Sequence, residues 1–164
     1  MPRQMFSAAL RRAGDGVAAI ERLAAVCVTS LTATAIRYTQ CTSDPVAVVV
    51  STGGSIDYCF MSDTLRDYDG IDWIRKRQAV PRTTPTFAFN RDPAKVRRAD
   101  RIEDASDLQT WFGGERSIEL REDVIGLGRY GKMLTVLHGI ELPDDGDEDD
   151  DEALSEPWPL RFRR

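Results

Sequence analysis

Histidine and cysteine, which often bind metals or act in catalysis, are scarce in this 164-residue chain, with one His and three Cys. Its single histidine, His138, lies in an apolar stretch typical of a β-strand, with no second histidine at metal-binding spacing. The cysteines Cys27, Cys41 and Cys59 form no C-x-x-C pair, which favours small core residues in a reducing, cytoplasmic compartment over a disulfide scaffold. We therefore expect no catalytic residue, no metal site and no cofactor.

Two other motifs have chemical precedents. Glu122 and Asp123 are adjacent in a predicted strand, so their side chains point to opposite faces and do not form a facing carboxylate pair. Residues 126–131 match G-x-G-x-x-G, but dinucleotide binding requires a helix to begin after the glycines. Residues 133–137 are instead typical of a strand, and this favours a glycine-rich hairpin turn.

Residues 1–43 show the periodicity of three helices. The first holds Met5 to Ala13 and ends at Gly14, the second is capped by Asp15, and the third is capped by Thr29 or Ser30. Because only about three residues separate the second and third helices, they must cross steeply, as in a helix-turn-helix unit.

A helix-turn-helix unit has two uses, and the sequence leaves both open. If it reads DNA, the third helix presents Thr32, Thr34 and Arg37 outward. However, residues 1–43 hold only five arginines against Asp15 and Glu21, and this small excess of positive charge attracts phosphates weakly. Packing or protein interaction is therefore the favoured use.

Residues 44–142 change to the alternating pattern of strands. A hairpin is expected from 46–51 and 56–61 around Gly53-Gly54, then an irregular stretch at 62–83 anchored by Trp73 and Ile74. A short strand at 86–89, a basic linker at 91–101, a helix capped by Asp104 and strands at 117–125 and 132–142 complete the pattern. It predicts an α+β domain whose antiparallel sheet is covered on one face.

The net charge of −5 comes from the C-terminal segment. Residues 144–156 hold nine acids and no base, whereas residues 1–143 hold 19 Lys and Arg against 18 Asp and Glu. Like charges and low hydrophobicity predict that 143–164 is a disordered tail. No apolar run is long enough for a membrane span, and no secretory signal is visible, so no membrane association is expected.

The segment Leu23 to Tyr38 resembles the region after the zinc-peptidase core in the ImmA/IrrE metallo-endopeptidase family. That region typically reads L-A-x-x-F-x-V-S-L-T-A-x-A-I-R-Y, and here Ser30 to Tyr38 gives the most specific match. The hairpin 46–56, the strand 120–122 and the strand 130–137 extend the resemblance over about residues 1–142. The family's catalytic H-E-x-x-H motif does not occur in this chain, so none of its catalytic residues is carried over.

The resemblance implies a helix-turn-helix-like segment at 1–43 followed by a GAF/PAS-like sensor or interaction domain at 44–142. Six aromatic residues are its candidate pocket lining: Tyr58, Phe60, Trp73, Phe87, Trp111 and Tyr130. The implied function is a non-catalytic regulatory, sensor or protein-interaction module in bacterial stress response or repressor control. Its expected partner is a repressor or a separate peptidase half, and analogy with GAF-like sheets also predicts a homodimer.

The sequence leaves two alternatives open. In the first alternative to the regulatory module, the chain is part of a zinc metallo-endopeptidase whose catalytic half is missing or encoded upstream. In the second, it is a DNA-binding helix-turn-helix regulator.

Overall fold

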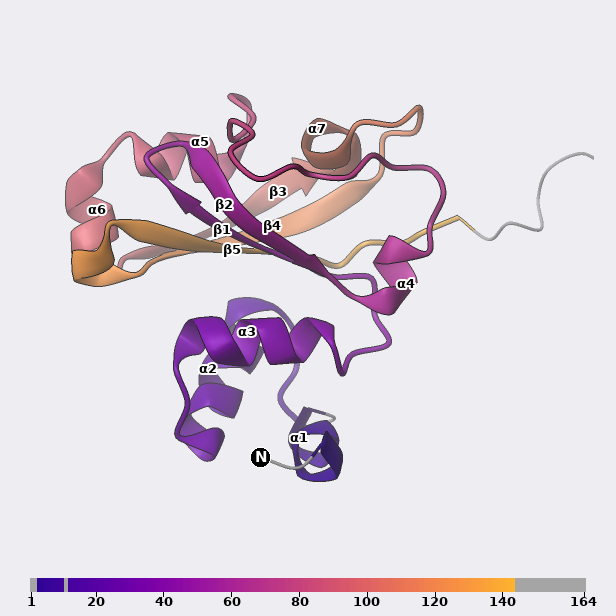
Figure 1. Ribbon diagram of the computed structural model, residues 1–164, viewed down its shortest axis with the longest axis vertical. Coiled ribbons are helices and arrows are strands. Elements are labelled where there is room, and N and C mark those ends of the chain that lie inside the picture. The colour runs from indigo at the N-terminus through magenta and orange to yellow at the C-terminus, as the bar shows by residue number, and fades with distance from the viewer. Residues whose placement is uncertain (1–2, 11, 144–164) are drawn as a thin grey trace, which may run out of the picture.

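The computed structural model of the protein describes residues 3–10 and 12–143, and all but the first residue of the predicted disordered tail, 143–164, lies outside them. Five antiparallel strands form one open sheet in the order β2-β1-β5-β4-β3. Helices and loops pack on both faces of this sheet (Figure 1). The expected α+β class is therefore confirmed, whereas the expected covering of one face alone is wrong.

The helices and strands follow one another along the chain with these bounds: α1 Arg3–Leu10, α2 Gly16–Cys27, α3 Leu31–Thr39, β1 Ala47–Thr52, β2 Ser55–Met61, α4 Asp63–Arg66, α5 Pro85–Asn90, α6 Pro93–Arg98, β3 Arg101–Asp107, α7 Leu108–Phe112, β4 Glu119–Gly126, the 3₁₀ helix η1 Gly128–Tyr130 and β5 Lys132–His138.

Helices α2 and α3 cover one face of the sheet, and α1 packs against α2 farther from the strands (Figure 1). The apolar stripe of α2, with Ile20 and Leu23, packs in one cluster with β-branched residues of the central strands such as Val48 and Val136. The segment 1–43 and this sheet face therefore share a single hydrophobic core. Of the two caps predicted for α3, the structure has Ser30, whose hydroxyl accepts a hydrogen bond from the Ala33 amide at 3.2 Å.

The opposite face is covered by α4, α5, α6, α7 and the loop between α4 and α5. Its core contains the fully buried Leu65, Trp111 and Leu137, and a smaller cluster around Phe89 and Val96 continues toward α6. Trp73, expected to anchor the loop, is instead 64% exposed, while Ile74 packs against the core. The two residues are adjacent, and only one of them points inward.

Three sequence-based assignments between residues 86 and 107 are wrong, and local caps explain each. The predicted strand 86–89 lies in helix α5, because the Thr84 hydroxyl accepts from the Phe87 amide and Pro85 occupies the first turn. The expected linker contains α6, which Asp92 caps. Residues 101–107 form strand β3, and the following helix α7 is capped by Asp107 and not by Asp104.

The two glycine turns are confirmed. Gly53 and Gly54 both adopt positive φ in the β1–β2 hairpin, where only glycine does so without strain. The G-x-G-x-x-G motif forms η1 in the turn between β4 and β5. Strand β5 and not a helix follows these glycines, so this turn lacks the helix N-terminus that binds a pyrophosphate.

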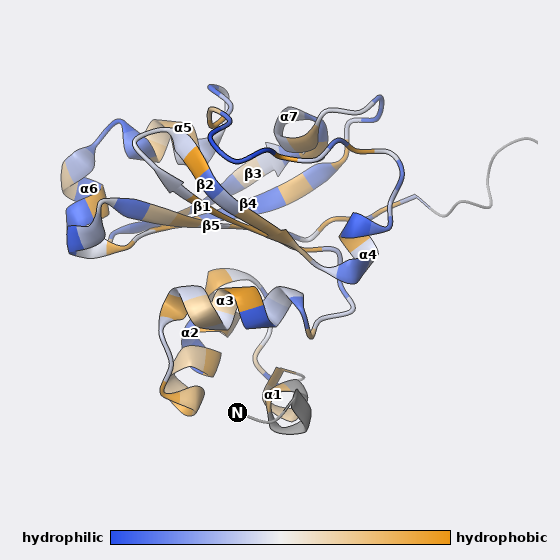
Figure 2. Ribbon diagram, in the orientation of Figure 1, coloured by the Kyte–Doolittle hydropathy of each residue, from blue (hydrophilic) through white to orange (hydrophobic). Residues whose placement is uncertain are grey.

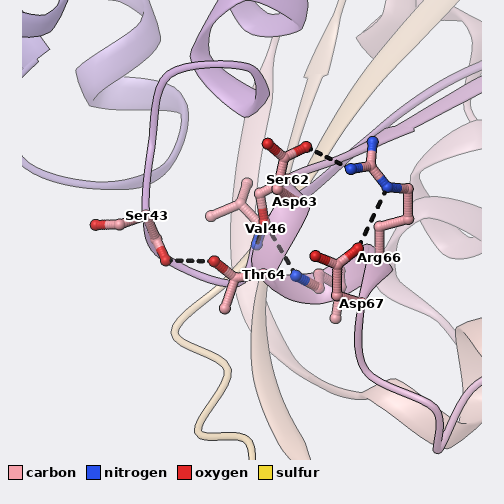
Figure 3. A network of polar contacts seen from close by, with 8 residues as sticks. Ser43, Val46, Ser62, Asp63, Thr64, Arg66 and Asp67 are labelled. Carbon is pink, nitrogen blue, oxygen red and sulfur yellow. Dashed lines mark hydrogen bonds and ion pairs between the residues drawn. The ribbon is translucent and has the colours of Figure 1, made fainter.

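A polar network fixes the passage from the helical segment into the sheet (Figure 3). The Val46 amide donates to the Ser62 hydroxyl at 3.0 Å, and the Ser62 amide donates to the Val46 carbonyl at 2.9 Å. The Thr64 hydroxyl reaches the Ser43 carbonyl at 2.7 Å. Helix α4 therefore holds the connection that leads from α3 to β1.

Among the described residues no single helix is long and apolar enough to cross a membrane. Taken together, α2 and α3 meet the length and composition of a span, but they are bent by 113° at their break.

Candidate functional site

Two adjacent carboxylates in β4, those of Glu122 and Asp123, lie on opposite faces of the sheet. Each accepts a hydrogen bond from the N-terminus of a helix. Glu122 is fully buried beneath α5. Its Oε1 accepts hydrogen bonds from the Thr86 amide and hydroxyl, both at 2.6 Å, and its Oε2 accepts from the Trp111 indole at 2.8 Å. The Thr86 and Thr135 hydroxyls lie 2.7 Å apart and extend the network. Three donors therefore converge on this carboxylate.

On the other face, Asp123 occupies the equivalent place beneath α2. Its Oδ2 accepts a hydrogen bond from the Val17 amide at 2.9 Å and lies 3.3 Å from His138 Nε2. Burial acts to raise the pKa of Asp123, but His138, the Val17 amide and the charge of Arg121 outweigh it and lower that pKa below its ordinary value. Asp15, which precedes α2, makes no side-chain cap bond, so Asp123 supplies the acceptor that this helix start needs.

Gly16 makes this approach possible. It has φ of 64°, and a Cβ at this position would lie 2.3 Å from Asp123 Oδ2 and 2.7 Å from His138 Nε2. Any larger residue would push α2 away from the carboxylate.

We expect Gly16→Ala to lower the free energy of unfolding by about 2 kcal/mol more than Gly53→Ala does. Gly53 is the matched control, because it also has positive φ but a Cβ added to it would have no neighbouring atom within 4 Å. Urea unfolding of both variants separates the cost of backbone strain, which they share, from the cost of the clash. Equal losses would show that α2 does not depend on the close approach.

A cavity of about 290 Å³ opens beside His138. Its polar lining is mainly acidic, with Asp15, Asp44 and Glu141 around the Tyr38 phenol. Burial, and then the charges of Asp15 and Asp44, raise the pKa of Tyr38 to about 12. Nowhere in residues 3–10 and 12–143 do three His, Cys, Asp or Glu side chains come together to hold a metal ion. Beside this cavity, His138 Nε2 lies 3.3 Å from Oδ2 of Asp123, whose carboxylate is already bonded to the start of α2.

The DNA-contact candidates lie differently from the prediction. Thr34 is buried, and its hydroxyl contacts the Thr29 hydroxyl and the Ser30 carbonyl, so it does not face outward as expected. Thr32 and Arg37 are half-buried, and the Arg37 guanidinium donates to Gln40 Oε1 at 3.1 Å. The N-terminal turn of α3 thus uses its threonine for local structure.

The six aromatic pocket candidates are spread over the molecule. Trp111 is buried against Glu122, whereas Phe60 and Phe87 are half-buried. Exposed rings are found at Tyr58, Trp73 and Tyr130. None of the six lines the three cavities described within residues 3–10 and 12–143. A cavity of about 740 Å³ lies instead between residues 116–121 and the segment 139–143.

The turn between α2 and α3 exposes apolar side chains that sequence reasoning did not single out. Val26 is 69% exposed and Val28 is 91% exposed. Val28 also ends α2 with φ of 52° and ψ of 50°, in the left-handed region that branched side chains avoid. We call Val26 and Val28 the α2–α3 corner. The missing signal was a helix end that carries valine where glycine or asparagine is usual.

All three cysteines are free thiols, as expected. Burial raises the pKa of Cys59 to about 12, so this thiol stays protonated at neutral pH.

Neither a scan against models of known protein families nor a search of curated proteins found a match for this chain.

Proposed function

We propose that this protein is a non-catalytic regulatory module of the ImmA/IrrE type, which acts by binding another protein through the α2–α3 corner. The resemblance of Leu23 to Tyr38 to that family supports the proposal. So does the bend of 113° between α2 and α3, which falls in the range of helix-turn-helix units. A repressor or a separate peptidase half is the expected partner, and the sheet with its α5–α7 layer is the GAF/PAS-like part.

Val28 is the observation that carries this proposal. A branched residue in the left-handed conformation costs about 1 kcal/mol or more relative to glycine. Its side chain is almost wholly in solvent, so packing within the described chain does not offset this strain. Strained residues persist where function requires them, and an exposed apolar side chain gains free energy when a partner covers it.

DNA binding by the same helices is the less favoured function. The α2–α3 corner is apolar, Thr34 is buried and Arg37 is bonded to Gln40, so few donors and charges of this unit face outward. DNA recognition needs basic and hydrogen-bonding side chains at this surface.

We expect Val28→Gly to raise the free energy of unfolding by about 1 kcal/mol, because it relieves the left-handed strain. Ala99→Gly is the matched control, since Ala99 also ends a helix in the left-handed conformation, with φ of 56°. It lies far along the chain from the corner and should give a smaller gain, because alanine is not branched. Thermal and urea unfolding measure the stability of both variants. A Val28→Gly protein less stable than the wild type would show that the left-handed conformation of Val28 is not strained.

Site-specific photo-crosslinking in the producing cell tests the function. A photoreactive phenylalanine analogue replaces Val28 in one strain and Thr110 in another, because Thr110 is exposed on α7, over the opposite sheet face. The proposal predicts an adduct with one protein from position 28 and not from position 110, and mass spectrometry should identify it as a repressor or a peptidase. Identical adducts from both positions, or a nucleic-acid adduct alone at position 28, would contradict it.

A further inference from the structure

The positive charge of the described chain is concentrated in one segment, on the sheet face opposite α1–α3. Residues 73–98 hold eight Lys and Arg but a single acid, Asp92. By contrast, residues 1–72 hold six bases and eight acids, and residues 99–143 hold five bases and nine acids. The carboxylate of Asp92 is itself used as the cap of α6. The segment therefore carries a strong local excess of positive charge.

These basic side chains are exposed and largely unpaired. All eight are exposed: Arg75, Lys76, Arg77, Arg82, Arg91, Lys95, Arg97 and Arg98. Of the eight, Arg98 alone forms an ion pair within residues 3–10 and 12–143, with Asp100 at 2.7 Å. The others are thus available to an anionic ligand.

Contacts around the β1–β2 hairpin join the two halves of this segment. The Gly54 carbonyl accepts from the Val80 amide at 2.9 Å, and the Arg77 amide donates to the Ile56 carbonyl at 2.7 Å. A Cβ on Gly54 would lie 3.3 Å from Asn90 Nδ2, so the end of α5 borders the same hairpin. The basic loop and the start of the α5–α6 connection therefore lie on either side of one turn.

The basic surface continues from α6 to η1, which pack together. A Cβ on Gly128 would lie 3.8 Å from the Arg97 carbonyl, and this places Arg129 beside α6. Figure 2 shows hydrophilic segments in the loop before α5, in the α5–α6 connection and in α6. We call Arg75–Arg77, Arg91, Lys95, Arg97 and Arg129 the basic strip.

Exposed aromatic rings accompany the basic strip. Trp73, 64% exposed, precedes the loop arginines, and Tyr130, 68% exposed, follows Arg129. Lys76 Nζ lies 5.2 Å from the Tyr58 ring centroid, and the Arg129 guanidinium lies 5.4 Å from that of Tyr130. Unpaired cations beside exposed rings are the two elements with which proteins bind single-stranded nucleic acids, through phosphates and stacked bases.

The rings favour nucleic acid over the other polyanion at hand, the acidic run 144–156 of this chain. That run complements the strip in charge, but nine of its 13 residues are Asp or Glu and none is an aromatic residue that could stack. We propose that the basic strip binds single-stranded nucleic acid, with its cations on the phosphates and Trp73 stacked on a base. This site is separate from the α2–α3 corner and does not depend on the proposed protein partner.

Fluorescence anisotropy with a labelled oligothymidylate and the full-length chain tests the proposal. We expect binding at about 50 mM salt. Added salt should weaken it, and the logarithm of the association constant should fall with the logarithm of the salt concentration with a slope of about −3 if four phosphates are neutralised. Arg75→Gln/Lys76→Gln/Arg77→Gln should weaken binding at least about tenfold. Trp73→Ala should weaken it about fivefold or more, and Trp73→Phe should retain part of the affinity.

The matched control removes three positive charges elsewhere, as Arg12→Gln/Arg37→Gln/Arg66→Gln. It should change the affinity less than about twofold, because these residues lie outside the strip. Thermal unfolding of every variant checks that the substitutions leave the fold intact. An equal loss in the control, no binding by the wild-type chain at low salt, or no loss with Trp73→Ala would each overturn the proposal.

A final variant tests whether the acidic run 144–156, and not nucleic acid, occupies the basic strip. It replaces the acids of 144–156 with Asn and Gln in the full-length chain. The proposal predicts that wild-type protein binds and that this variant binds no more than severalfold tighter. Binding seen only in this variant would show that the run, and not nucleic acid, occupies the strip, and would overturn the proposal.

Discussion

Replacing Glu122 with alanine should lower the free energy of unfolding by about 4 kcal/mol, the largest effect expected of any single substitution here. The change removes the acceptor for the Thr86 amide and hydroxyl and for the Trp111 indole, all of them buried. These donors are too deeply buried for solvent to replace the carboxylate, and the start of α5 loses its support. Urea unfolding followed by circular dichroism measures the loss.

Two further variants make this result specific. Glu119→Ala alters the same strand at an exposed position and should cost less than about 0.5 kcal/mol. Glu122→Gln keeps one oxygen but turns an amide N–H against a donor, so its cost should lie between those of the two alanine variants. A Glu122→Ala protein that loses less than about 1 kcal/mol would show that the three donors find other partners.

Replacing Asp123 with alanine should cost about 3 kcal/mol at neutral pH, and this loss should shrink in acid. The folded-state pKa of Asp123 is lowered, so the ionised carboxylate contributes stability above the pKa of the unfolded chain. That contribution disappears as the pH falls through the lowered folded-state pKa. The stability of the wild-type protein should therefore decline toward low pH more steeply than that of Asp123→Ala.

Asp104→Ala serves as the control, because Asp104 is exposed in β3 and accepts a hydrogen bond from the neighbouring Ala105 amide. Its unfolding free energy should follow the wild-type pH dependence closely. Parallel pH profiles for wild type and Asp123→Ala would contradict the role of this carboxylate beneath α2.

Much of the fold follows from local pattern. The hairpin at Gly53-Gly54, the helix that begins after Ser30 and the two last strands were predictable, because period and cap residues agree there. The start of α2 after Asp15 was also predicted, but Asp15 makes no side-chain cap bond, and Asp123 supplies the acceptor instead. A strand was wrongly predicted at residues 86–89 because Thr and Phe favour strands. The cap at Thr84, together with Pro85 in the first turn, starts a helix there instead. Strand β3 was missed because charges on an exposed edge strand hide its period.

The polar centre of the protein was only half visible in the sequence. The pattern placed Glu122 and Asp123 on opposite faces, which the sheet confirms. It gave no sign that both faces are covered, so that each carboxylate is buried against a helix N-terminus. Two adjacent acids within an apolar strand are the signal to look for, because each one needs buried donors.

The α2–α3 corner was not predictable, since the conformation of Val28 depends on how α3 docks on the sheet. The basic strip was visible as charge, but the sequence did not show that a hairpin joins its two halves. In both cases the sequence lists the residues but does not show which other residues they contact.

We propose that Val28 keeps its strained, exposed conformation because a partner protein covers it. Isothermal titration of the partner captured at position 28 against Val28→Gly and Ala99→Gly tests this claim most directly. We expect Val28→Gly to bind this partner at least about tenfold more weakly than Ala99→Gly, although its free energy of unfolding is higher. Equal dissociation constants for the two variants would contradict it.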